Sequence, residues 1–510
     1  MNRLYKGLIL LFLSLALVLG LCACEEPAKQ EHQHTFSSTW ETDGDYHWHV
    51  ATCEHTDEIS GYTRHIWGKL VNNGNGTATY TCKVCNKKVT KALPSVISMV
   101  NTGPGEDASK GVVISWHSIT TGSSLEYKKT DAESWTIVPN AECNEVFSSA
   151  DWHEGEAADH YRCKVYLNDL TPDSTYNYRI KDSGGDYSEV SFFKTAEADT
   201  TNFQFMWLSD NHVPKGGEKT LERVSDLVAF AQAKDDVDID FVLFTGDMVN
   251  TGKYYNHWKY WSDSGLLGNM TYAFVAGNHD YYDGTRNEDG DKVRETNAYF
   301  KDVCAYPENN IAGEKSVLDS NYWFIWNRVL FVCIDNFTSE GTETSSLSGA
   351  SVSAQKAWFK AVVDANKGNY DYLIFAQHLP WFNTDTAPCS YGGYGSWRTI
   401  FDTYKVDFAL SSDEHTYRRT YPLYGNAKTD LVKGKVATGT VYVTSNMTEG
   451  SSVSAVKNEA KSGLKYVQYT ASGVGGVYFT VTPTEMTLHL IGNKGIEYDT
   501  ITVLKKDRSN

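Results

Sequence analysis

Five short apolar runs in this chain each end in a cluster of aspartate, histidine or asparagine. The middle run, residues 272–275, breaks into Gly277-Asn278-His279-Asp280. A β-prone run that breaks in this way is typical of a strand that delivers polar side chains to the loop at its carboxyl end. The other four runs end, in chain order, in Asp210-Asn211-His212, Gly246-Asp247, Gln377-His378 and Ser412-Asp413-Glu414-His415. Carboxylate, amide and imidazole groups are ligands of metal ions, so the sequence predicts a metal site.

A site with such ligands can hydrolyse phosphate esters. Near neutral pH this reaction needs a hydroxide, neutralisation of charge on the phosphoryl oxygens and stabilisation of the departing alkoxide. Two metal ions about 3.5–4 Å apart supply all three, because water bound to a metal can have a pKa of roughly 7 instead of about 15.7. A dinuclear site also needs a carboxylate that bridges the two ions.

The ligand-bearing runs belong to a segment in which strands alternate with helices. Residues 218–234 and 353–366 carry apolar side chains at helical spacing, whereas residues 322–335 and 477–504 have the pattern of paired strands. Mixed sheets with helices outside indicate a layered α/β domain over residues 200–506. Ligand sites at the carboxyl ends of strands are the rule in such folds.

These motifs resemble those of the calcineurin-like metallophosphoesterase superfamily, and the residues that follow His378 and His415 are similar to its purple-acid-phosphatase-like branch. The resemblance implies a four-layer αββα sandwich with two metal ions, drawn from Fe, Mn, Zn and Mg. It implies that metal one is bound by Asp210, His212, Asp247 and His415, and metal two by Asp247, Asn278, His378 and Asp413. It also implies that His279 contacts the phosphoryl oxygen or protonates the leaving group, and that Asp280 orients the His279 ring.

The chain departs from the purple-acid-phosphatase pattern at two positions. The tyrosine ligand that the family has three residues after the Gly-Asp aspartate is Asn250 here, and His212 supplies a histidine instead, so no purple centre is expected. Asp413 stands where the family has a histidine on metal two. A carboxylate oxygen there favours harder ions such as Mn²⁺, Mg²⁺ or Fe over Zn²⁺. The alternative is that metal two binds weakly and activity is low.

The first 24 residues have the pattern of an export signal. Arg3 and Lys6 precede an apolar run at residues 8–19, which is too short for a typical membrane-spanning helix. The following Leu21-Cys22-Ala23-Cys24 resembles a bacterial lipobox. It predicts lipidation at Cys24 and an extracytoplasmic protein anchored to the cell membrane, with ordinary secretion as the alternative. Residues 25–31 form a polar tether.

Residues 32–93 are rich in histidine and cysteine and resemble small zinc-ribbon-like repeats of bacterial surface proteins. Cysteine and histidine are ligands of structural zinc, and a module with few aliphatic residues needs a metal ion or a similar cross-link to stabilise it. The predicted zinc ligands are Cys53, His65, Cys82 and Cys85. Cys82 and Cys85 form a C-x-x-C pair, but the spacing leaves open whether Cys53, His55 or His65 completes the set. It also leaves open a Cys82–Cys85 disulfide or free thiols.

Residues 94–196 have the sequence pattern of an all-β domain, with strand-like runs at 112–116 and 174–180 separated by turn sequences. About a hundred residues of short strands is typical of a fibronectin-III-like sandwich. Its Ser-Trp and Leu-x-Pro features resemble the domain that precedes the catalytic domain of purple acid phosphatases. Cys143 and Cys163 are a candidate disulfide within it. Its expected role is spacing and packing against the catalytic domain.

Composition limits the functions that this chain can have. A length of 510 residues predicts several domains, and 41% hydrophobic content is that of a globular protein. A formal charge of −18 argues against nucleic acid as a partner. We therefore expect a cell-surface dinuclear-metal phosphoesterase that hydrolyses small phosphomonoesters by attack of a metal-bound hydroxide. The alternatives are a phosphodiesterase or nucleotidase that uses the same site, and a non-catalytic surface-binding lipoprotein with a degenerate site.

Overall fold

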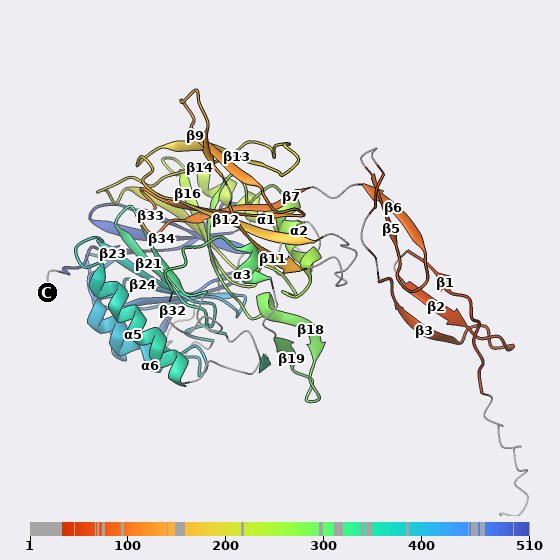
Figure 1. Cartoon of the computed structure of the whole chain (residues 1–510). Coiled ribbons are helices and arrows are strands. Elements are labelled where there is room, and N and C mark those ends of the chain that lie inside the picture. Colours follow the sequence, from red (N-terminus) through yellow and green to blue (C-terminus); the bar gives the residue numbers. More distant parts are fainter. Residues whose placement is uncertain are drawn as a thin grey trace, which may run out of the picture. The chain divides into compact units, whose positions relative to one another are not determined.

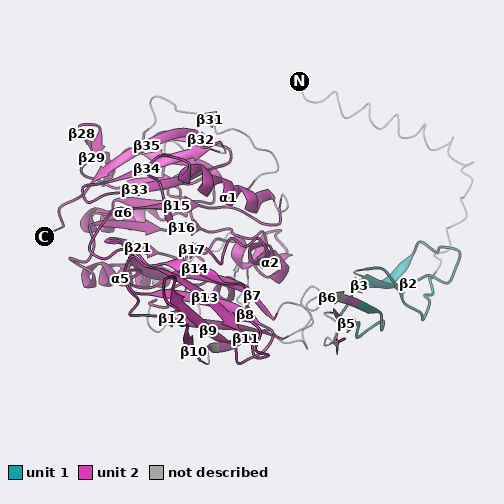
Figure 2. Ribbon diagram, turned by 90° about the horizontal axis from the view of Figure 1, so that it is seen from above, with its two compact units in different colours: residues 1–67, 81–89 teal, residues 68–80, 90–510 magenta. Residues whose placement is uncertain are grey.

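The computed structural model describes residues 33–508 with gaps. The predicted export signal, Cys24 and the tether lie outside the described residues. The gaps within this range are residues 45, 67, 69–70, 74–76, 93–95, 140, 148–158, 216–218, 295–298, 311–319, 338–340, 343–348, 384–386, 447, 450–456, 459–464 and 493. The chain separates into two compact units, one of residues 1–67 and 81–89 and one of residues 68–80 and 90–510 (Figure 2).

The smaller unit contains a three-stranded antiparallel sheet in the order β1-β2-β3. Its strands are β1 (Glu41–Thr42), β2 (Tyr46–Val50) and β3 (Ile59–Arg64). Three short strands follow in the chain: β4 (Val71–Asn72), β5 (Thr77–Thr81) and β6 (Lys88–Ala92). Where the side chains of the smaller unit are described, the buried apolar ones are Ala51 and Cys82. So small an apolar core calls for another source of stability.

A β-sandwich comes next, as the sequence predicts. One of its two sheets contains β7 (Ile97–Pro104), β8 (Val112–Ser118), β11 (Glu142–Phe147) and β12 (His160–Leu167). The other contains β9 (Ser124–Lys129), β10 (Thr136–Val138), β13 (Thr175–Lys181) and β14 (Ser191–Lys194). Trp116, Leu125 and Ile180 pack between them. Cys143 and Cys163 lie opposite each other in the β11–β12 pair and form a disulfide.

The first sheet of the sandwich continues into the following α/β domain. β7 pairs in parallel with β17 (Thr271–Val275) at Thr102 and Thr271. The result is one twelve-stranded sheet in the order β11-β12-β8-β7-β17-β16-β15-β33-β34-β35-β29-β28. Its remaining strands are β15 (Phe203–Leu208), β16 (Ile239–Thr245), β28 (Leu431–Val432), β29 (Lys435–Val436), β33 (Gly475–Val481), β34 (Glu485–Gly492) and β35 (Glu497–Leu504).

A second, eight-stranded sheet has the order β20-β21-β23-β24-β30-β25-β32-β31. Its strands are β20 (Tyr322–Trp326), β21 (Val329–Cys333), β23 (Tyr372–Ala376), β24 (Phe408–Ser411), β25 (Thr416–Thr420), β30 (Val441–Thr444), β31 (Lys457–Asn458) and β32 (Val467–Ser472). The two sheets face each other through apolar side chains. Phe205 and Phe241 of the larger sheet meet Phe331 of the smaller one edge to face, with ring centroids 5.2 and 5.4 Å apart.

Helices cover the outer faces of both sheets (Figure 1). α1 (Lys219–Gln232) and α2 (Tyr255–Asp263) pack on the larger sheet, where Trp261 contacts Phe244. α5 (Gly349–Ala365) and α6 (Tyr394–Tyr404) pack on the smaller sheet, where Phe359 and Phe401 both contact Phe375. The domain is therefore an αββα sandwich. None of the helices within the described residues is long and apolar enough to cross a membrane.

Shorter elements complete the domain around its strand ends. A helical turn, α3 (Phe300–Val303), and a 3-10 turn at His279–Tyr281 follow the end of β17. A small antiparallel sheet contains β18 (Tyr282–Arg286), β19 (Lys292–Arg294) and β22 (Gly341–Thr342), and β26 (Leu423–Tyr424) pairs with β27 (Ala427–Lys428). β15, β16 and β17 are parallel, as are β21, β23, β24 and β30. Their carboxyl ends therefore share an edge within each sheet, and these edges carry the polar motifs.

Candidate metal centre

Five strand ends bring the predicted ligand residues together. Asp210, His212, Asp247 and Asn278 follow β15, β16 and β17 of the larger sheet, and His378, Asp413 and His415 follow β23 and β24 of the facing sheet. Three sets of side chains have potential ligand atoms within 4.8 Å of one another. These sets are Asp210, His212 and His415; His212, Asp247 and His279; and Asp210, Asp247 and His378.

The first set fits the predicted metal one. His212 Nε2 lies 3.0 Å from His415 Nε2, which in turn lies 3.4 Å from Asp210 Oδ1. Asp210 Oδ1 is buried and has no hydrogen-bond partner among the described residues. A buried carboxylate oxygen without a hydrogen bond is costly unless something else compensates its charge. Together with two imidazole nitrogens it forms a donor set suited to a divalent cation.

Asp247 lies between this first set and a second group of side chains, formed by His378 and Asn278. Its Oδ2 is 3.6 Å from His212 Nε2 and 3.5 Å from His378 Nε2. His378 Nε2 is also 3.0 Å from Asn278 Oδ1, while its Nδ1–H donates to the carbonyl of Thr245 at 2.7 Å. That hydrogen bond leaves the Nε2 lone pair directed at the cluster, as metal-binding histidines require. One carboxylate oxygen therefore faces both sets, which is the arrangement of a bridging ligand.

Asp413, which the sequence predicts as a ligand of metal two, also reaches the cluster. Its Oδ1 lies 3.6 Å from His378 Nε2, and 23% of its side chain is exposed. The carboxylate is thus on the side of His378 and Asn278, where the sequence predicts metal two.

Glu449 is a carboxylate near the cluster that no sequence motif indicated. Its Oε2 lies 3.8 Å from His212 Nε2, and Lys215 pairs with its Oε1 at 3.0 Å. Its backbone N–H donates to the carbonyl of Asp210 at 3.0 Å, which fixes the position of the loop after β30. No recognisable pattern surrounds Glu449, so only the fold identifies it.

The backbone is strained where the candidate ligands lie. Asp210, His212, Asp247, Asp413 and His415 have φ angles of 52°, 52°, 56°, 73° and 53°. This left-handed conformation is uncommon for residues other than glycine and costs about 1–3 kcal/mol for each residue. Strain of this kind persists only where the surrounding structure imposes it, and it concentrates at functional sites.

Two glycines of the motifs allow the ligand loops to approach each other. A Cβ atom on Gly246 would lie 2.3 Å from His378 Nδ1, and one on Gly277 would lie 2.2 Å from Asp247 Oδ1. Both distances are far below van der Waals contact. The glycines in Gly-Asp and Gly-Asn-His-Asp are therefore required for packing between the loops.

The contacts of Asp280 differ from the predicted ones. Its carboxylate accepts hydrogen bonds from the backbone N–H groups of Asp247, Val249 and Gly277 at 2.9, 3.2 and 2.9 Å. The His279 ring is oriented instead by Asn250, whose carbonyl accepts its Nδ1–H at 2.8 Å. The 3-10 turn over these residues directs the carboxylate at the backbone of the neighbouring loop. Asp280 thus joins the loops after β16 and β17 and does not orient the ring.

His279 and Lys292 form a polar pair beside the cluster. His279 Nε2 faces Lys292 Nζ at 3.2 Å, and the ammonium group also lies 4.7 Å from the centre of the Tyr282 ring. The backbone N–H of His279 donates to Asp247 Oδ1 at 2.8 Å, which holds the residue against the cluster. Lys292 comes from the β18–β19 hairpin and no motif indicated it.

The electrostatics of the cluster favour cations. Burial lowers the pKa of His212 to about 3. Burial also opposes protonation of His415, but the Asp210 carboxylate outweighs it and raises the pKa to about 9. Burial opposes protonation of His378 as well, but the Asp247 carboxylate outweighs this effect and raises the pKa of His378 well above its usual value. Carboxylates that hold protons on neighbouring imidazoles create a negative potential that a metal ion would neutralise, with release of those protons.

In the smaller unit the predicted zinc ligands divide between two sets. His65, Cys82 and Cys85 lie together with His47, which the sequence had not singled out. Cys53 lies with His34 and His55 instead. The C-x-x-C pair was recognisable from its spacing, but its histidine partners depend on how β2 and β3 pair.

Comparisons with known proteins agree with this geometry. Residues 203–417 match the family model described as calcineurin-like phosphoesterase, and residues 98–195 match the model for the purple acid phosphatase N-terminal domain. Two uncharacterized proteins from strains of Mycobacterium tuberculosis are 26% identical over 345 residues, which is 64% of this chain and 62% of theirs. The match thus spans less than two thirds of these relatives.

A solved structure with a similar fold is a purple acid phosphatase from yellow lupin (Lupinus luteus) seeds. It matches with a TM-score of 0.62 and 16% identity over 85% of this chain and 80% of the lupin chain. At this identity the likeness concerns the fold alone. The comparisons therefore liken residues 98–195 to a purple acid phosphatase N-terminal domain and residues 203–417 to a calcineurin-like phosphoesterase.

Proposed function

We propose that this chain hydrolyses phosphomonoesters at a two-metal centre formed by the cluster. The observation that carries the proposal is the position of Asp247, since one of its oxygens faces His212 at 3.6 Å and His378 at 3.5 Å. Metal ions in such a site supply Lewis acidity and an activated water. Two carboxylates, an amide and three imidazoles provide enough oxygen and nitrogen donors for both ions, and Asp413 adds a further carboxylate.

His279 and Lys292 provide the contacts to the substrate. The Asn250 carbonyl fixes the His279 ring, and the ring nitrogen that remains faces the Lys292 ammonium group. We assign this pair to the phosphoryl oxygens that are not in contact with metal. A monoester carries more negative charge on its phosphoryl group than a diester does, so a lysine at this position favours monoesters.

The test of the catalytic proposal compares Asp247→Ala with the wild-type chain on an aryl phosphomonoester, with Mn²⁺ or Fe supplied. Loss of the bridging carboxylate should abolish turnover and remove metal, as measured by elemental analysis. Asp226→Ala, on the exposed side of α1, is the matched control and should behave like the wild type. Wild-type turnover no faster than that of Asp247→Ala, across the metals and esters tried, would disprove the proposal.

The substrate class is tested with Lys292→Gln, which removes the charge and keeps a polar side chain. The kcat/KM for an aryl phosphomonoester should fall more than that for the matching phosphodiester. An equal fall in kcat/KM for both esters would show that Lys292 does not determine the preference for monoesters. A faster wild-type reaction with the diester would identify the chain as a phosphodiesterase.

We further propose that the chain is exported and anchored to the cell membrane through lipid on Cys24. The lipobox-like Leu21-Cys22-Ala23-Cys24 supports this location. Several acyl chains anchor a protein stably, whereas a single chain binds only marginally. Cys24→Ser should therefore appear in the medium or remain unprocessed, while Cys22→Ser should stay in the membrane fraction. A Cys24→Ser protein that is processed and membrane-bound would contradict the assignment.

A further inference from the structure

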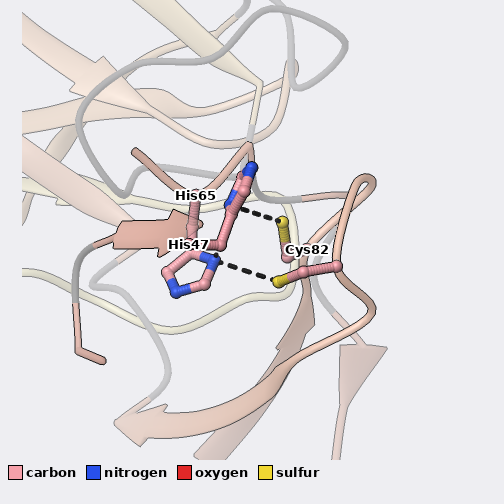
Figure 3. Close-up of side chains that lie close together, drawn as sticks. His47, His65 and Cys82 are labelled. Carbon is pink, nitrogen blue, oxygen red and sulfur yellow. Dashed lines mark hydrogen bonds between the residues drawn. The ribbon is translucent and has the colours of Figure 1, made fainter. Parts of the chain in front are cut away.

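Two histidines and two cysteines of the smaller unit converge on one point. His47 comes from β2, His65 follows β3 directly, and Cys82 and Cys85 lie in the turn after β5. Figure 3 shows the rings of His47 and His65 and the thiol of Cys82 directed toward one another. One ligand atom from each of the four side chains lies within 4.8 Å of all the others. His47, His65 and Cys82 are at most 1% exposed.

The distances between these atoms are those of ligands around one tetrahedral zinc ion. With Zn–N of about 2.0 Å and Zn–S of about 2.3 Å, two nitrogens would be about 3.3 Å apart, and a nitrogen and a sulfur about 3.5 Å apart. His47 Nδ1 and His65 Nδ1 are 3.3 Å apart. His65 Nδ1 lies 3.3 Å from Cys85 Sγ, and His47 Nδ1 lies 3.9 Å from Cys82 Sγ. The set therefore has room for one ion at its centre.

The surrounding contacts orient the donors for this role. His65 Nε2–H donates to the carbonyl of Asp43 at 3.3 Å, which leaves the Nδ1 lone pair directed at the other three side chains. The backbone N–H of Val84 points at Cys82 Sγ at 3.4 Å, as suits a thiolate. Asn86, with a φ of 59°, closes the turn through a hydrogen bond from its N–H to the carbonyl of Cys82 at 3.1 Å.

We propose that His47, His65, Cys82 and Cys85 bind one structural zinc ion that holds the smaller unit together. Four protein ligands leave no open coordination position, which is typical of structural sites and not of catalytic ones. The ion would join β2, the end of β3 and the turn at residues 82–85. In a unit with so few buried apolar side chains, this link is the main cross-connection.

The set of His34, Cys53 and His55 is distinct from this site. Cys53 Sγ lies 3.4 Å from His34 Nδ1 and 3.8 Å from His55 Nδ1. It offers three ligands where the first set offers four, and its side chains are half-buried or exposed. Cys53 is therefore the internal control for Cys82 and Cys85.

The experiment uses the full chain with Co²⁺ in place of zinc. Thiolate-to-cobalt charge-transfer absorption does not arise from the candidate metal centre of the α/β domain, because its candidate ligands include no cysteine. The band should have the intensity of two thiolates, and it should be lost in Cys82→Ser and weakened in His47→Ala. Cys53→Ser should leave it unchanged. A band that depends on Cys53 and not on His47 would overturn the proposed ligand set.

A second measurement needs no substitution and covers the case in which a variant fails to fold. Native wild-type chain is treated with an alkylating reagent before and after removal of metal by a chelator, and each cysteine is followed by peptide mass spectrometry. Cys82 and Cys85 should react at least tenfold faster after chelation, whereas Cys53 should react at the same rate in both states. A Cys82–Cys85 disulfide, or equal reaction rates with and without chelator, would overturn the proposal.

Discussion

In the proposed reaction His279 acts on the substrate without binding a metal, since Asn250 accepts from one ring nitrogen and the other faces Lys292. We expect His279→Ala to retain both metal ions and to lower turnover by roughly 10²–10⁴-fold, the usual contribution of a positioned acid or base. Metal content by elemental analysis and single-turnover rates test this. His378→Ala, which removes a ligand, is the comparison and should lose metal. Loss of one metal equivalent from His279→Ala would show that its role is coordination.

Asp413 Oδ1 lies 3.6 Å from His378 Nε2, so we propose that Asp413 binds metal two through an anionic oxygen, where the resembled pattern has a neutral nitrogen. We expect Asp413→His to shift the metal-activation profile toward Zn²⁺ while activity persists. Asp413→Ala should lower the occupancy of one metal and leave the other bound. Activity profiles over Mn²⁺, Mg²⁺, Fe and Zn²⁺ measure the first effect. Two metal equivalents bound by Asp413→Ala as tightly as by the wild type would rule Asp413 out as a ligand.

At the scale of elements, the site depends on two loops that interlock at Gly277. A Cβ atom there would meet Asp247 at 2.2–2.3 Å, so Gly277→Ala should push the bridging carboxylate out of place. A displacement of about 1 Å near reacting groups can cost roughly 10²-fold in rate. We expect metal loss and at least that fall in turnover, with an unchanged circular dichroism spectrum. Gly395→Ala on α6, where nothing lies within 4 Å of the added atom, should be tolerated.

The same elements explain what the sequence could and could not predict. The ligand loops were predictable because each motif directly follows an apolar run, and such runs form parallel strands whose ends meet. Lys292 and Glu449 were not predictable, because a hairpin and a distant loop carry them to the cluster without any local pattern. His47 was overlooked for a related reason. Its place beside Cys82 depends on strand pairing, whereas the C-x-x-C pair is visible from spacing alone.

At the scale of the whole molecule, His117 joins the sandwich to the α/β domain. Its Nε2–H donates to the carbonyl of Asp302 at 2.9 Å, and its Nδ1 accepts from the hydroxyl of Tyr255 at 2.8 Å. The second bond needs a neutral ring, because a protonated Nδ1 cannot accept a hydrogen bond. Burial lowers the pKa of His117 to about 3, and the nearby His160 and Arg162 act in the same direction.

This lowered pKa predicts a loss of stability in mild acid. Below a pH of about 6.5 the unfolded chain binds a proton at His117 that the folded chain does not, so stability falls as the pH drops from about 6.5 toward 3. The contribution of this one residue is about 2 kcal/mol at pH 5. His117→Gln, which does not titrate, should lose less stability between pH 7 and pH 5 in urea unfolding. Parallel losses in both proteins would contradict the prediction.

The pairing of β7 with β17 also bears on whether the α/β domain stays soluble without the sandwich. A chain cut just before β15 would lack β7, and β17 would become an edge strand with unpaired N–H and C=O groups. Exposed edges of this kind pair with other chains and lead to aggregation. Asn101, which accepts the N–H of Ala305 and donates to the carbonyl of Val303, would be lost as well. We therefore expect a fragment that begins at β15 to aggregate more readily than a chain that includes the sandwich.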